Sequence, residues 1–196
     1  MRYHTPLRNV LRKRVESGGK NMKKTQSILG PAVRSGTVAG LAAAAVASVA
    51  GKCEVDSYAA PLNATSHIIW GEEAAEEDQP SLKYTLTGFL LNHGSGIFWA
   101  SFYERLFGRQ SDGLNGGRRS AAASKDPMPL VKPVLGGAAV AAAAYIIDYH
   151  LIPKRFTPGF EKRLSGKSLA AIFAALAVGL AACDVIDAAI DQRKQS

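Results

Sequence analysis

The chain has 196 residues, 47% of them hydrophobic, with two cysteines and a net charge of +8. This length suits one domain or one small membrane bundle. No GxSxG, P-loop, HExxH or CxxC motif is present, so nothing indicates catalysis of the common soluble types. The positive charge does not indicate nucleic-acid binding, because nine of the 24 cations lie in residues 1–34 and no interleaved aromatic surface accompanies them.

The charges are segregated along the chain. Four windows without any charged side chain cover residues 35–51, 86–103, 133–147 and 168–183. Charged connectors separate these windows, which is typical of membrane crossings. With flanking polar residues included, we predict an all-α, four-span transmembrane helix bundle with spans at about 35–51, 86–107, 133–152 and 168–190. A soluble Ala-rich bundle is the alternative, but soluble helices carry a polar face that these windows lack.

The charge distribution also predicts the topology. Residues 1–34 are predicted to be a basic cytoplasmic tail, 35–191 a membrane domain and 192–196 a short C-terminal tail. Placing the N-terminus in the cytoplasm puts 17 Lys and Arg inside and 7 outside, as the positive-inside rule requires. The sequence from Met22 also resembles a secretory signal, so a cleaved first span is the alternative.

Two connectors are predicted to lie outside. The first, 52–83, is expected to hold an interfacial helix at 64–78, with Trp70 at the headgroup level and acidic side chains in water. The second is basic, and its cations are predicted to contact lipid phosphates, a partner or the acidic first connector: Lys154, Arg155, Lys162 and Arg163. Ser165 or Ser168 is expected to cap the last helix.

Ionisable residues inside a membrane are costly and therefore candidates for function. In the predicted topology four such groups converge in the outer half of the bundle: His67, His93, Asp148 and His150. These four are acceptable ligands for a metal ion, and His93 with His150 for a haem. Histidine also titrates near neutral pH, so a proton path is a further hypothesis. The structural alternative pairs Asp148 with Lys154, Arg155 or His150.

A second acidic group lies near the inner end of the last span. Asp184, Asp187 and Asp191 recur at helical spacing. Acidic groups at a helix C-terminus oppose the macrodipole and need cations nearby. We expect these aspartates to clamp the inner face through Arg105, Arg118, Arg119 or the basic tail, or to dock a partner.

Three segments carry a resemblance to known proteins. They are "APLNATSHIIWG", "NHGSGIFWASFYERL" and "DYHLIPKRFTPGFEKRLS". With them the chain resembles an uncharacterised family of small multi-pass inner-membrane proteins of Gram-negative bacteria, over roughly residues 35–190. The resemblance implies a bacterial inner-membrane location and this architecture, and no catalytic activity.

Small residues recur along the spans, as in Gly36 and Gly40 of the first, and such faces drive helix packing in lipid. The sequence therefore favours an accessory or scaffolding subunit of a membrane protein complex, bound to another membrane protein or to a second copy. The alternative is a metal- or haem-binding redox or proton-handling membrane protein that uses the histidine and aspartate cluster. A lone transporter is disfavoured, because four short spans enclose little aqueous space.

Overall fold

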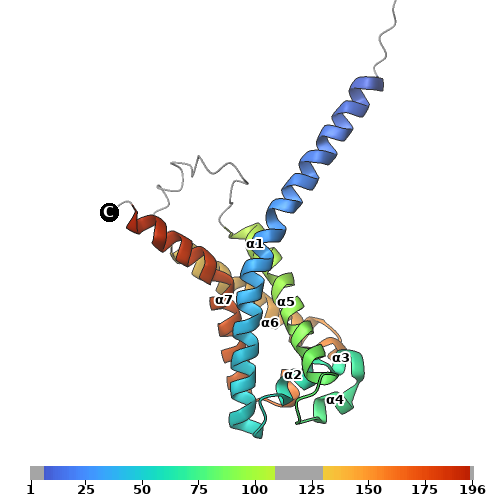
Figure 1. Ribbon diagram of the computed structural model, residues 1–196, viewed down its shortest axis with the longest axis vertical. Helices are drawn as coiled ribbons and strands as arrows, with labels where there is room; N and C mark the ends of the chain where they lie inside the picture. Colours follow the sequence, from blue (N-terminus) through green and yellow to red (C-terminus); the bar gives the residue numbers. More distant parts are fainter. Residues whose placement is uncertain (1–6, 109–129, 195–196) are drawn as a thin grey trace, which may run out of the picture.

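The computed structural model describes residues 7–108 and 130–194, with side chains from Ile28 onward. Every regular element in these ranges is helical, which confirms the all-α prediction. Four long helices alternate in direction: α1 (Leu7–Val55), α5 (Tyr84–Leu106), α6 (Val131–Ile146) and α7 (Gly166–Arg193) (Figure 1). The N-terminal part of α1 projects beyond the other helices, and α7 ends on the same side (Figure 1).

Three segments of the described chain are long and apolar enough to cross a membrane. They are Ile28–Val55, Val131–Leu151 and Gly166–Arg193, and they correspond to the first, third and fourth predicted spans. The second predicted span, α5, is not among them. It has 23 residues and is about 35 Å long, but Asn92, His93 and Ser95 make its centre polar. The structure is thus compatible with membrane localisation, and three of the four predicted spans are helices long and apolar enough to cross a membrane.

The first helix extends into the predicted tail. Helix α1 begins at Leu7 and continues through Pro31 into the first apolar window. The predicted span began at residue 35, after the last charged residue of the tail, whereas the apolar segment of the helix begins at Ile28. Arg34 thus lies within this segment, and its guanidinium is 2.9 Å from the Asp187 carboxylate of α7.

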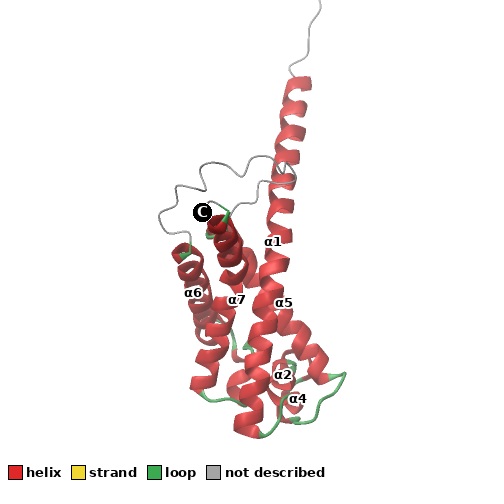
Figure 2. Cartoon of the chain, turned by 60° about the vertical axis from the view of Figure 1, so that its left-hand side comes forward, coloured by secondary structure: helices red, strands yellow, loops and turns green. Residues whose placement is uncertain are grey.

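The connectors at the opposite end form a structure that we call the cap. It consists of α2 (Ala60–Thr65), α3 (His67–Trp70), α4 (Glu72–Glu76) and the 3-10 turns η3 (Lys154–Phe156) and η4 (Phe160–Lys162) (Figure 2). The single helix predicted at 64–78 is broken into short pieces. Gly71 makes one break, since its φ of 86° suits glycine. All of α2 is buried against α1 and α5, so this part of the connector does not lie on a surface.

Helix α6 changes its winding before it reaches the cap. Residues Ile147–Leu151 form a π-helical turn, η2, which Pro153 follows after an extended residue, Ile152. A π turn holds more residues per turn than an α-helix and changes which way the following side chains point. Such turns are frequent at functional sites. Here η2 carries Asp148, one of the predicted site residues.

The end of α1 is tied to the start of α7. The Ser165 backbone N–H and hydroxyl donate to the Glu54 carboxylate at 2.6 and 2.8 Å, and the Ser168 hydroxyl donates to it as well. The Ser165 hydroxyl also accepts a bond from the Ser168 N–H at 3.4 Å. Ser165 is therefore the N-cap of α7, as predicted.

Glycine faces bring the long helices into backbone contact. A Cβ at Gly36 of α1 would lie 2.5 Å from the Ile97 Cα of α5, and a Cβ at Gly179 of α7 would overlap Ala39 of α1. Helix α1 thus packs between α5 and α7, with which it makes its most extensive contacts. On the other side of α7, Gly137 of α6 lies against the Ala177 carbonyl. Close approach of this kind is how small residues stabilise helix bundles in lipid.

The glycine contacts predict opposite effects for two positions of α5. A Cβ at Gly88 would overlap the Leu62 carbonyl of α2, whereas a Cβ at Gly94 would meet nothing within 4 Å. We expect Gly88→Ala to destabilise the protein by about 1–3 kcal/mol, the usual range for overpacking. Gly94→Ala should be neutral or stabilising, because alanine favours a helix more than glycine. Thermal unfolding in mild detergent compares the two; equal unfolding temperatures would contradict this packing.

Candidate functional site

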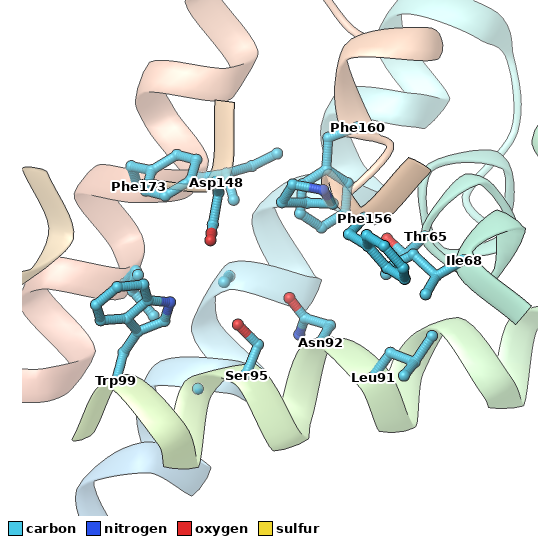
Figure 3. A pocket seen from close by; sticks show the side chains of 15 residues that line it. Thr65, Ile68, Leu91, Asn92, Ser95, Trp99, Asp148, Phe156, Phe160 and Phe173 are labelled. Carbon is cyan, nitrogen blue, oxygen red and sulfur yellow. The ribbon is translucent and has the colours of Figure 1, made fainter. Parts of the chain in front are cut away.

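A cavity of about 220 Å³ lies where the long helices meet the cap. Its walls come from α1, the cap, α5, η2 and α7, so segments far apart in the sequence build it together (Figure 3). Most of the lining is apolar. The polar side chains that line it are Thr65, Asn92, Ser95 and Asp148, together with the indole of Trp99. A largely apolar pocket with a few polar groups is the usual form of a small-molecule site.

Asp148 is the ionisable group in this lining. Its half-buried side chain points from η2 into the cavity, toward Ser95 and Asn92 of α5 (Figure 3). Within the described ranges, none of the hydrogen bonds or ion pairs of side chains involves the Asp148 carboxylate. The predicted pairing with Lys154, Arg155 or His150 is therefore not formed. A carboxylate without a partner in apolar surroundings is costly, which singles out this residue.

Two polar side chains at the centre of α5 contact its neighbour α1. The Asn92 side-chain amide donates to the Gly40 carbonyl of α1 at 2.9 Å, which leaves its oxygen toward the cavity (Figure 3). The His93 Nε2 lies 3.4 Å from the Thr37 hydroxyl of α1, and its ring stacks on Phe89 at 5.9 Å between centroids. His93 thus contacts α1 instead of lining the cavity.

The other two predicted histidines have separate surroundings. His67 is buried, and its Nδ1 lies 2.7 Å from the Ala64 carbonyl within the cap. Gly159, with a φ of 82°, packs on this ring, where a Cβ would come within 2.9 Å of Nδ1. His150 is exposed, and its ring meets the edge of Tyr145 at 5.6 Å.

The structure does not assemble the predicted metal or haem ligands. No three histidine, cysteine, aspartate or glutamate side chains gather as a metal site anywhere in residues 28–108 and 130–194. The ring of His93 contacts Thr37 and Phe89, and that of His150 contacts Tyr145. The helix register accounts for this, because α5 turns His93 toward α1 while η2 turns Asp148 inward and leaves His150 exposed.

Ion pairs hold the cap together. The Lys162 ammonium lies 2.6 Å from the Glu72 carboxylate, and the Arg163 guanidinium pairs with Asp78 and donates to the Ala75 carbonyl at 3.1 Å. The predicted attraction between the acidic and the basic connector is thereby confirmed. Lys154 and Arg155 are exposed, and neither joins an ion pair between described residues.

A second polar cluster lies at the end of the bundle opposite the cap. The Tyr103 hydroxyl donates to the buried Asp184 carboxylate at 2.8 Å, and the Ser35 hydroxyl donates to Glu104 at 2.8 Å. Arg34 pairs with Asp187, as described above. Asp184 and Asp187 therefore have partners within the chain. Of the predicted arginine partners, Arg118 and Arg119 lie outside the described residues.

Sequence reasoning missed the aromatic part of the cavity. Phe156, Phe160 and Phe173 line it, although none of them stood out as a candidate. Phe156 and Phe160 lie in the basic connector and Phe173 in a long apolar span, where single aromatic residues are common. No local pattern marks them, because the three rings meet only through the packing of the cap and α7 around the cavity.

No known protein family, curated protein or solved structure matches this chain. The resemblance to small inner-membrane proteins therefore stays a prediction. What the chain does must be inferred from its own residues.

The cap ion pair predicts a dependence on pH. The hydrogen bond from the Lys162 ammonium lowers the pKa of the Glu72 carboxyl below its ordinary value. A lowered pKa means that the pair stabilises the fold above the unfolded pKa of about 4.3 and that this stabilisation is lost as the pH falls through the lower folded value. Both side chains are partly exposed, so we expect a coupling energy of about 0.5–1 kcal/mol at pH 7.

A double-mutant cycle with Glu72→Gln and Lys162→Gln, measured by thermal unfolding at pH 7 and at about pH 3, checks this pair. The matched control is a cycle with Glu76→Gln, an exposed acid on the same short helix, which should show no coupling to Lys162. A coupling energy that is unchanged at low pH would contradict the ion pair.

Proposed function

We propose that this chain is a four-crossing protein of the bacterial inner membrane, with a cytoplasmic N-terminus, that binds a small solute in the capped cavity. Asp148 would be the binding carboxylate. The observation that carries this proposal is the position of that group, half-buried in a cavity and without a partner among the described residues. A bound solute or proton would offset the cost of placing it there.

The surface of α5 supports its assignment as the one crossing that length and composition leave open, the second along the chain. Large apolar side chains are exposed at every fourth position of this helix: Leu86, Leu90, Phe98, Phe102 and Leu106. The exposed charged side chain, Arg105, lies at the end of the helix away from the cap. Gly94 continues the same line and has open space around its Cβ position. A helix with an apolar outer stripe and polar groups turned toward its neighbours is suited to lipid, although its overall hydropathy is low.

The cavity favours solute binding over the predicted accessory role. In the accessory role, another membrane protein was predicted to bind to the small-residue faces of the helices. Gly36 and Gly179 on these faces are already occupied by contacts within the chain. A partner subunit would have to dock on the apolar outer faces, which lipid can cover equally well. Metal or haem chemistry has less support, because the predicted ligands are dispersed.

A hydrophobic carbodiimide tests whether Asp148 is a reachable binding carboxyl. Such reagents enter apolar sites in membrane proteins and react with protonated carboxyl groups. Treating the full chain in liposomes with dicyclohexylcarbodiimide should place an adduct on Asp148, located by tandem mass spectrometry, at several times the yield on Asp187, which is paired with Arg34. Asp148→Asn should lose this adduct and keep the others. Yields on Asp148 no higher than on exposed carboxyls outside the membrane would contradict the proposal.

A further inference from the structure

We infer that the cavity at Asp148 binds a small organic ammonium ion, with the charged nitrogen at the carboxylate and the apolar body between aromatic rings. This inference rests on the proposed function and specifies the chemical class of the solute. Its basis is the arrangement of acceptors, rings and volume in the cavity (Figure 3).

Hydrogen-bond acceptors converge at one place in the cavity. The Asp148 carboxylate points down from η2, and the Ser95 hydroxyl and the Asn92 side-chain oxygen point up from α5 (Figure 3). The Asn92 nitrogen is already engaged by the Gly40 carbonyl, so its oxygen is the end available to a ligand. A group that meets all three should carry several N–H donors and a positive charge. A protonated amine has both, and its charge would compensate that of the carboxylate.

Aromatic rings flank these acceptors on both sides. Trp99 and Phe173 lie on one side of Asp148, and Phe156 and Phe160 lie on the other (Figure 3). Ring faces attract cations, and their area covers the apolar part of a ligand. An inorganic cation would leave these walls without contact, whereas an amine with a ring or a short carbon chain would fill them.

The volume sets the size of the ligand. About 220 Å³ corresponds to roughly seven water molecules at about 30 Å³ each. This is smaller than most drug-binding pockets. A single ring with a short aminoalkyl arm is the size of solute that fits. Phe160 is buried and Phe156 is 53% exposed, so Phe156 marks the side on which the cavity opens at the cap.

The test uses 2-phenylethylammonium as the probe, with the full chain in liposomes. The probe should slow carbodiimide labelling of Asp148 at least fivefold. At equal concentration and ionic strength, 2-phenylethanol, which has the same ring and no charge, should not, and neither should sodium. The probe should also change the fluorescence of Trp99 in a Trp70→Phe background. Asp148→Asn should weaken that binding at least tenfold, whereas Asp187→Asn, a carboxylate at the other end of the bundle, should leave it unchanged.

Each other outcome overturns the inference in a distinct way. Equal protection by the alcohol would mean an apolar pocket without selectivity for charge. Equal protection by sodium would mean an inorganic cation site. Strong labelling of Asp148 that no amine affects would reject the ammonium ligand and leave the proposed function standing, whereas failure to label Asp148 above exposed carboxyls would reject both.

Discussion

The polar side chains of one helix, α5, constrain the whole structure. A helix with an amide, an imidazole and hydroxyls along it is stable in hydrocarbon only if those groups are satisfied by neighbouring protein. In this chain the neighbour is α1: Asn92 bonds to the Gly40 carbonyl, His93 lies near the Thr37 hydroxyl, and Glu104 accepts from Ser35. These contacts require α1 and α5 to approach closely, and the glycines at their contact make that approach sterically allowed.

The cavity follows from the same packing. With α1 held between α5 and α7, α6 packs mainly on α7, makes a smaller contact with α5 and ends in the π-helical turn η2. The cap then folds over this end, tied down by Lys162 and Arg163 to the acidic connector. Asp148 is thereby placed over the polar side of α5 without a partner of its own in the described chain. The hydrogen bonds between α1 and α5 explain how these helices hold together, and the Asp148 carboxylate, which has no such bond among the described residues, indicates where the bundle binds something.

The sequence predicted much of the fold and less of the site. Charge-free windows located the long helices, because segregation of charge is what a bilayer imposes on a sequence. The first helix extends beyond the predicted span, because a charged residue such as Arg34 can lie within a helix and pair with a carboxylate of α7. Asp148 was a candidate because an ionisable residue at a span is unusual in itself. Its separation from the histidines was not predictable, because it depends on the π turn and on which face of α5 meets α1. The same holds for Phe173, which joins the site only through packing.

The orientation of α5 in lipid tests the central claim most directly. A spin label on Phe98→Cys, with Cys53 and Cys183 replaced by serine, would sit on the apolar outer stripe of α5 near the middle of the proposed bilayer. In liposomes we predict that oxygen, which dissolves in the hydrocarbon, relaxes this label much more than a water-soluble nickel chelate does. A label on Leu82→Cys, in the connector before α5, should show the reverse. A label at Phe98 that the chelate reaches as readily as it reaches Leu82 would place α5 in water and contradict the account.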